Sequence, residues 1–268
     1  MTAKHWLETQ IRRLPEPFRE EWRALMLFGL ILLVAAWLSF EIIEEVFLEG
    51  AVFAPDPAVY TGLQGLRTSW LDQIMVTITE LGDTPVVIAI AAAVSLWLIR
   101  ERAWHTLTYW LIAIGGGSLI NSAIKLGLHR ARPGDMGYDG VSIFSFPSGH
   151  STTNAVLYGF LIIIMSRKLP FAMRIPVVIT LVLFVGLIAF SRLYLGAHWL
   201  SDVAGGLLFG SAWLALLALF YMWRPAEAIE PLKLLSIAAA TLVIAGGLNI
   251  LFNHSADLAR YAVQRAIT

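Results

Sequence analysis

The sequence contains no cysteine, and only 14% of its 268 residues are charged. The absence of cysteine excludes disulfide bonds, catalysis by a thiolate and metal sites built from cysteine. Soluble domains carry about 25% charged residues, so a chain that is 58% hydrophobic is typical of a membrane protein. The formal net charge is zero, which gives no support for nucleic-acid binding.

The first 23 residues also lack the apolar core of a signal peptide, because charged residues are spread through them. Trp6, Leu7 and Ile11 recur at near-helical spacing among basic residues such as Arg12 and Arg13. This pattern favours an amphipathic segment over residues 1–23 that lies on the cytoplasmic membrane surface. A partly ordered polar tail is an equal alternative.

A bilayer core about 30 Å thick needs roughly 20 apolar residues per helix. Seven apolar stretches are candidates, at 24–40, 85–99, 103–126, 150–165, 175–190, 199–223 and 232–252. We therefore expect an all-α, polytopic membrane helix bundle. Its six-helix core covers 24–223, an additional C-terminal membrane helix covers 231–252, and 253–268 form a short tail. The stretch 69–81 is expected to be an interfacial or re-entrant piece.

The distribution of lysine and arginine predicts the orientation. Most of the basic residues, from Lys4 and Arg12 to Arg224 and Lys233, fall on the same side as the N-terminus. We therefore expect a protein of the cytoplasmic membrane whose N-terminus lies on the cytoplasmic side. The first outer loop, 41–82, is long and acidic, and its role is not evident from the sequence.

Three clusters place polar and charged groups beside predicted membrane helices. They are Lys125-Leu-Gly-Leu-His-Arg-Ala-Arg132-Pro133, Pro147-Ser148-Gly149-His150, and Ser191-Arg192-Leu-Tyr-Leu-Gly-Ala-His198-Trp-Leu-Ser-Asp202. The predicted topology brings all three to the outer face. Charged groups at such positions are costly and mark functional sites.

The cations in these clusters are suited to binding an anion. Arginine offers a bidentate fork for phosphoryl oxygens, and lysine offers a point charge. The sequence therefore indicates a phosphate site formed by Lys125, Arg132 and Arg192. Ser148 and Gly149 would add a hydroxyl and free amides at a helix N-terminus. Arg130 could join this site or face water.

Two histidines and an aspartate remain in the same clusters. His198 and Asp202 are four residues apart, so the carboxylate can hold one imidazole nitrogen and leave the other as a nucleophile. His150 comes from a different helix and suits a general acid for the leaving group. The same three residues could bind a metal, but the surrounding cations would repel a divalent ion. We expect no metal and no other cofactor.

Taken together, the three clusters resemble the signature motifs of the type 2 phosphatidic acid phosphatase (PAP2) superfamily, over roughly residues 80–222. The resemblance implies a six-helix core with an outward-facing site and metal-free hydrolysis through a phosphohistidine. It implies His198 as nucleophile, Asp202 as its orienting partner and His150 as acid. It also implies phosphoryl binding by Lys125, Arg132, Ser148, Gly149 and Arg192. Family substrates are phosphatidic acid, phosphatidylglycerol phosphate and undecaprenyl pyrophosphate.

The function that we expect is a bacterial membrane phosphatase that hydrolyses a lipid phosphate or diphosphate, with the bilayer and the lipid as its partners. A non-catalytic lipid-phosphate binder or flippase would need the cations but neither histidine. Vanadate-dependent haloperoxidases resemble the same motifs, but they are soluble, whereas this chain is rich in apolar spans. The sequence does not identify the lipid or the oligomeric state.

Overall fold

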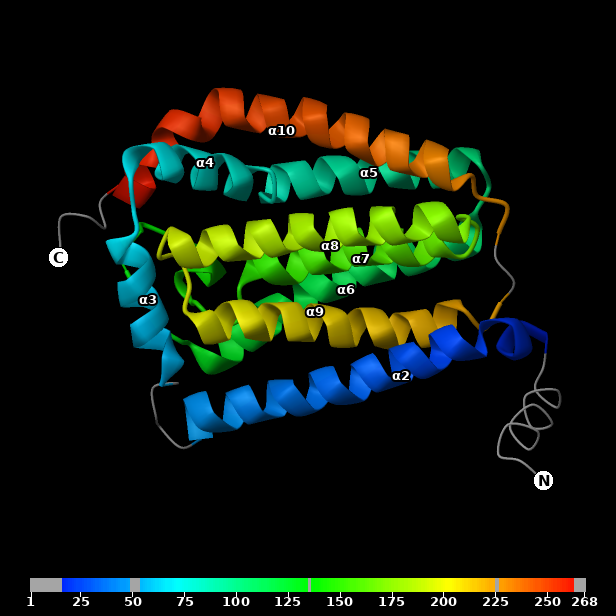
Figure 1. Cartoon of the computed structure of the whole chain (residues 1–268), viewed down its shortest axis with the longest axis horizontal. Coiled ribbons are helices and arrows are strands. Elements are labelled where there is room, and N and C mark those ends of the chain that lie inside the picture. The colour runs from blue at the N-terminus through cyan, green and yellow to red at the C-terminus, as the bar shows by residue number, and fades with distance from the viewer. Residues whose placement is uncertain (1–15, 49–53, 135, 225–226, 263–268) are drawn as a thin grey trace.

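A computed structural model describes residues 16–48, 54–134, 136–224 and 227–262. Every regular element in these ranges is helical, which confirms the predicted all-α class (Figure 1). In chain order they are α2 (Glu16–Ile43), a π-helical turn (Glu44–Leu48), α3 (Pro55–Gly65), α4 (Ser69–Glu80), α5 (Thr84–Arg100), α6 (Trp104–Leu128), a 3-10 turn (Gly140–Ile143), α7 (Gly149–Ser166), α8 (Phe171–Tyr194), α9 (Leu200–Tyr221) and α10 (Pro231–Ala262). Most of the expected amphipathic segment 1–23 lies outside the described residues.

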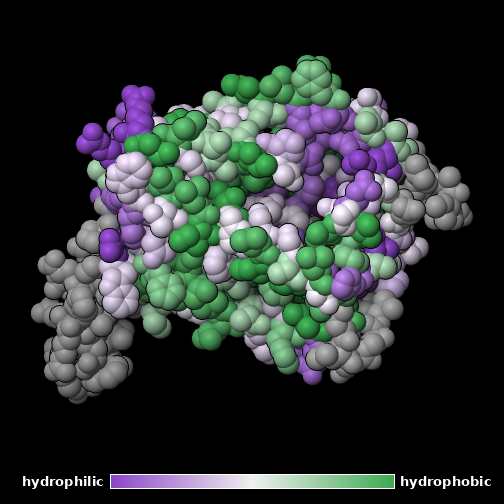
Figure 2. Space-filling model, turned by 180° about the vertical axis from the view of Figure 1, so that it is seen from behind, coloured by the Kyte–Doolittle hydropathy of each residue, from purple (hydrophilic) through white to green (hydrophobic). Residues whose placement is uncertain are grey.

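Six segments of the described chain are long and apolar enough to cross a membrane. They are Glu21–Val46, Ser69–Arg100, Trp104–Leu128, Phe171–Tyr194, Leu200–Tyr221 and Pro231–Ala262. Their outward side chains are apolar: Leu33, Val243 and Phe252 are each more than 70% exposed. Figure 2 shows hydrophobic side chains gathered over the middle of one face and a hydrophilic hollow towards one end. Such a belt is the surface that a bilayer covers.

The remaining long helix, α7, runs through the interior of the bundle. It packs against α6, α8 and α9, and side chains such as Leu157, Phe160 and Leu161 are buried. Its first turns are polar because they include His150 and Asn154. The sequence predicted a span here, and the other helices, rather than lipid, cover most of it.

Helix α4 continues into α5, and this arrangement corrects the expectation of a separate interfacial or re-entrant piece at 69–81. The two helices lie end to end (Figure 1) and form one candidate span. The break between them contains Gly82, where a Cβ would lie 2.6 Å from Cγ2 of Ile188. Glycine therefore allows the break to pack against α8. The carbonyl of Gly82 accepts a 2.9 Å bond from Asn154 of α7.

Helix α10 is longer than the sequence suggested. The predicted tail from residue 253 is helical as far as Ala262, and residues 263–268 lie outside the described chain. The helix runs beside α5 and α4 (Figure 1). Its last turns thus reach the end of the bundle where α6 and α8 end and where α7 and α9 begin.

Candidate active site

A cavity of about 360 Å³ opens at this end of the bundle. Residues of all three sequence motifs line it, namely Lys125, Arg132, Gly149, His150, Arg192 and His198. Val87 and Ile88 of α5 and Ile114 of α6 form an apolar part of the wall, and Ile88 is 61% exposed. The cavity therefore combines a cationic interior with an apolar side that continues onto the outer surface of the bundle.

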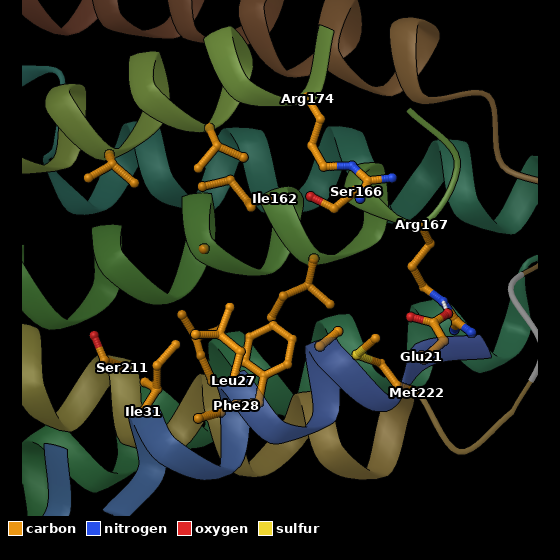
Figure 3. A pocket seen from close by; sticks show the side chains of 17 residues that line it. Glu21, Leu27, Phe28, Ile31, Ile162, Ser166, Arg167, Arg174, Ser211 and Met222 are labelled. Atoms are coloured by element: carbon orange, nitrogen blue, oxygen red, sulfur yellow. Dashed lines mark hydrogen bonds and ion pairs between the residues drawn. The ribbon is translucent and has the colours of Figure 1, made fainter. Parts of the chain in front are cut away.

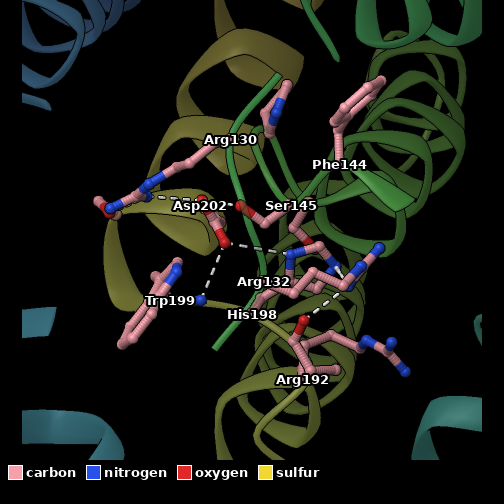
Figure 4. Close-up of polar contacts among 12 residues, drawn as sticks. Arg130, Arg132, Phe144, Ser145, Arg192, His198, Trp199 and Asp202 are labelled. Carbon is pink, nitrogen blue, oxygen red and sulfur yellow. Dashed lines mark hydrogen bonds and ion pairs between the residues drawn. The ribbon is translucent and has the colours of Figure 1, made fainter. Parts of the chain in front are cut away.

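His198 lies between α8 and α9, and its imidazole is held between a carboxylate and a guanidinium (Figure 4). Nδ1 lies 3.3 Å from Oδ2 of Asp202, the contact that the four-residue spacing predicts. Nε2 lies 3.1 Å from Nη1 of Arg132. Because a guanidinium can only donate, Nε2 must be the acceptor and the proton resides on Nδ1. This tautomer leaves a lone pair on Nε2.

The surroundings of His198 favour its neutral form. Burial, together with the positive charges of Arg132 and Arg192, holds the pKa of His198 well below its usual range. Burial also lowers the pKa of Arg132 to about 10, so the guanidinium remains charged at neutral pH. A neutral imidazole among fixed cations is suited to attack on an anionic phosphoryl group.

Asp202 is fixed by more than its histidine. Its carboxylate accepts a 2.9 Å bond from the amide of Trp199 and a 2.7 Å bond from Nη1 of Arg130. The other terminal nitrogen of Arg130 lies 2.7 Å from Asp56 of α3, and Asp56 accepts from the amide of Ser201 at 2.8 Å. Arg130, whose role the sequence left open, therefore anchors Asp202 and does not line the cavity.

His150 has a carboxylate partner that sequence reasoning missed. Its Nε2 lies 2.7 Å from Oδ1 of Asp83, in the break between α4 and α5. The second oxygen of Asp83 accepts a 2.9 Å bond from Asn249 of α10. Each of the two histidines thus has its own carboxylate. In the sequence, Asp83 stands out as an acidic residue beside a predicted span in a chain with few charges. No motif or spacing links it to His150, however.

Two of the three cations donate to backbone carbonyls around the cavity. Nζ of Lys125 lies 2.5 Å from the carbonyl of Phe144 and 3.3 Å from that of Ser145. Arg132 donates from Nη2 and Nε to the carbonyl of Ser142, at 2.7 and 2.9 Å. The connection between α6 and α7 therefore curls around these charges and holds them at the cavity.

The third cation, Arg192, is 1% exposed and lies deeper in the bundle. Nη1 donates to Thr79 at 2.7 Å and to the hydroxyl of Tyr261 at 2.8 Å, and Nη2 donates to the hydroxyl of Tyr138 at 2.6 Å. Its Nε is buried and has no hydrogen-bond partner in the part of the chain that the structure describes. A buried N–H without a partner costs about 1–3 kcal/mol, so one donor of Arg192, a residue that lines the cavity, is left unsatisfied. Sequence reasoning also missed both tyrosines.

Ser148 is buried at the start of α7. Its hydroxyl caps α7 by accepting from the hydroxyl and the amide of Ser151, at 3.0 and 3.4 Å, and its side chain is absent from the cavity wall. The amide of Ser148 donates to the carbonyl of Asp202 at 3.0 Å. Ser148 therefore joins the starts of α7 and α9, while Gly149 is the residue of this pair that reaches the cavity.

Among the residues that the structure describes, no three histidine or acidic side chains gather as they would around a metal ion. The cavity instead brings two histidine–carboxylate pairs together with three cations. Fold and site together define a multi-pass membrane protein with a cationic cavity at one end of its helix bundle.

Comparison with known proteins identifies the family. Residues 106–226 match the model of the PAP2 superfamily. The chain is 30% identical over 183 residues to phosphatidylglycerophosphatase B of Bacillus subtilis, covering 66% of this chain and 88% of the relative. It is also 30% identical over 142 residues to an uncharacterized 22.5 kDa protein of the Klebsiella pneumoniae cps region, covering 52% of this chain and 65% of that protein. The chain belongs to the PAP2 superfamily.

A solved structure supports the same assignment. The crystal structure of a transmembrane PAP2-type phosphatidylglycerolphosphate phosphatase from Bacillus subtilis matches with a TM-score of 0.53 and 30% identity. The match covers 72% of this chain and 92% of that one. The protein is therefore a multi-pass membrane member of a lipid phosphatase superfamily. Helix α10, which supplies Asn249 and Tyr261, lies beyond the segment that matches the family model.

Proposed function

We propose that this protein hydrolyses a lipid phosphate at the outer face of the cytoplasmic membrane through a phosphohistidine at His198. The observation that carries the proposal is the convergence of His198–Asp202 and His150–Asp83 on one cavity with Lys125, Arg132 and Arg192. A lipid-phosphate binder or flippase would need the cations, but two oriented imidazoles would serve no purpose in it.

In the first step, the Nε2 lone pair of His198 attacks phosphorus, and a P–N bond forms as the bond to the leaving oxygen breaks. The leaving oxygen takes the electron pair of that bond and a proton from the protonated imidazole of His150. Asp83 accepts from Nε2 of His150, so Nδ1 is the nitrogen that delivers the proton. Asp202 stabilises the positive charge that develops on His198.

In the second step, water attacks the phosphohistidine while His150, now neutral, takes a proton from the water. The P–N bond breaks, its electron pair returns to Nε2, and inorganic phosphate leaves. Asp202 keeps the same tautomer of His198 throughout. His150 ends the cycle protonated, and the proton balance is complete.

The cations would hold the phosphoryl oxygens during both steps, which is the main protein contribution in phosphoryl transfer. Nε of Arg192 is free to donate, and the amides at the start of α7, beginning at Gly149, form an anion site. Arg132 would exchange its contact with Nε2 of His198 for a phosphoryl oxygen, and this exchange releases the lone pair. Ser148 would contribute by capping α7 and so holding the start of this helix in place.

Phosphatidylglycerol phosphate is the substrate that we propose first, because both a relative and a solved structure at 30% identity carry that activity in their names. The apolar wall of Val87, Ile88 and Ile114 would admit acyl chains between α5 and α6. The predicted orientation, with the N-terminus inside, puts the cavity on the periplasmic or extracellular side. Phosphatidic acid and undecaprenyl pyrophosphate are the alternatives.

Phosphate release from these three lipids by the purified protein tests the proposal. We expect the highest kcat/KM with phosphatidylglycerol phosphate and no turnover by His198→Ala, whose folding is checked by its elution volume and melting temperature. Release of phosphate by a folded His198→Ala variant at the normal rate would refute the mechanism. A stronger preference for undecaprenyl pyrophosphate would refute the substrate alone.

A further inference from the structure

A second cavity, of about 430 Å³, lies towards the end of the bundle where α7 ends and α8 begins, opposite the catalytic cavity (Figure 1). Its walls come from α2, α7, α8 and α9, and most of its lining is apolar, including Phe28, Ile162 and Leu214. Two lining residues, Leu27 and Val182, are more than half exposed on the outer surface of the bundle. The cavity is thus large enough for a small ligand, since such pockets span about 300–1,000 Å³, and it opens sideways towards the membrane.

The charged groups of the cavity lie together at one of its ends. Arg167 and Arg174 lie there with Glu21 and Ser166 (Figure 3). The side chain of Arg167 is 5% exposed, and its Nε lies 2.8 Å from Glu21. Arg174 donates from Nη2 to the carbonyl of Leu169 at 3.1 Å. This end therefore carries two guanidinium groups and one carboxylate.

Nη2 of Arg167 donates to the carbonyl of Arg224 at 2.8 Å. Among the described residues, two buried N–H groups of these guanidiniums have no hydrogen-bond partner, Nη1 of Arg167 and Nε of Arg174. Folded proteins seldom leave buried donors unpaired, because the unmade hydrogen bond costs free energy. The carboxylate of Glu21 neutralises one of the two charges. The ligand that complements this end is an anion, and the apolar remainder of the cavity requires that the anion carry a hydrocarbon chain.

We propose that this cavity is a binding site for an anionic phospholipid of the leaflet on the N-terminal side, with its phosphate against Arg167 and Arg174 and one acyl chain between α2 and α8. The site is separate from the catalytic cavity and does not depend on the proposed hydrolysis. A lipid bound there would join α2, which packs mainly against α9, to α7 and α8. It would thus act as a structural ligand of the bundle.

Native mass spectrometry of the full-length protein in detergent tests the site with phosphatidylserine and phosphatidylcholine of the same acyl chains. Neither lipid is a substrate or product of the proposed reaction. We expect the protein to retain one phosphatidylserine in preference to phosphatidylcholine. Arg174→Gln removes a charge-assisted bond and should weaken retention by about ten-fold. The control, Lys168→Gln, removes an exposed charge at the same end and should retain the lipid as the unsubstituted protein does.

Val178→Trp, which fills the cavity from α8, should reduce retention of both lipids, provided that its elution volume matches that of the unsubstituted protein. Equal retention of the two lipids would overturn the proposal. Equal losses of bound phosphatidylserine in Arg174→Gln and Lys168→Gln would also overturn it, because they would indicate a general attraction of the lipid to positive charge. A dimer without bound lipid would also overturn it, in favour of a second copy of the chain on this face.

Discussion

Asp83→Asn probes the least expected part of the site, because it removes a carboxylate from His150 while keeping the size of the side chain. The 2.7 Å contact between Asp83 and Nε2 of His150 stabilises the protonated imidazole. Hydrogen bonds that involve a charged group contribute about 1.5–3 kcal/mol, and each 1.36 kcal/mol is a factor of about ten in rate. We therefore expect kcat to fall by roughly 10–100-fold. His150→Ala, which removes the acid, should cost about 10²–10⁴-fold.

The assay compares two leaving groups. A lipid phosphate leaves as an alkoxide that needs a proton, whereas p-nitrophenyl phosphate leaves as a stable phenolate that does not. The loss in Asp83→Asn should therefore be large with the lipid and small with the aryl ester. An equal loss with both substrates would mean that Asp83 supports the fold or the nucleophile. No loss with the lipid would refute the role of the pair.

Three further predictions concern the cations and the metal. Arg132→Gln should move the acid limb of the pH profile of kcat/KM to higher pH, because the nearby charge of Arg132 helps to hold the pKa of His198 low. Both proteins are assayed with the same lipid, so the ionisation of the substrate affects the two profiles equally. Tyr261→Phe leaves Nη1 of Arg192 with one hydrogen-bond partner fewer. A lost hydrogen bond of this kind costs roughly 1–3 kcal/mol, so kcat/KM should fall about ten-fold. The control, Tyr109→Phe, should leave kcat/KM unchanged. A metal chelator should leave phosphate release unchanged and vanadate should inhibit it; loss of activity with chelator would return a metal to the mechanism.

Much of the cavity could be predicted because its residues lie in short, contiguous motifs. His198 and Asp202 are four residues apart, so local helical geometry alone brings them together. Lys125 and Arg132 flank the end of one predicted span, and Gly149 and His150 open another. These positions follow from the topology of antiparallel helices, which the apolar spans determine.

The partners that come from distant segments could not be predicted in the same way. Asp83 and His150 are 67 residues apart, and Asn249 is 166 residues from Asp83. No periodicity or motif links such positions, because their contact depends on how α4, α5 and α10 pack. Ser148 is predicted from its motif to bind phosphate, and the structure adds that it caps α7 from its place before the first turn of the helix.

Two helical segments extend further than the sequence suggested, and both differences have a physical reason. Glycine and aspartate at positions 82 and 83 read as the end of a segment, although the chain continues in line from α4 to α5. Polar residues of α10, among them Asn253 and Asp257, read as a tail outside the membrane. In the structure Asp83, Asn253 and Asp257 line a polar cavity together with His150 and Tyr138, so the polarity of these residues reflects their proximity to the site.

A rapid-quench experiment with lipid substrate labelled with ³²P at the scissile phosphate tests the central claim most directly. The protein is denatured within one turnover, digested, and mapped for labelled peptides by mass spectrometry. We predict an acid-labile, alkali-stable label on His198, formed at the rate of turnover and absent from His198→Ala. Turnover without any labelled protein, or a label on His150, would contradict the account.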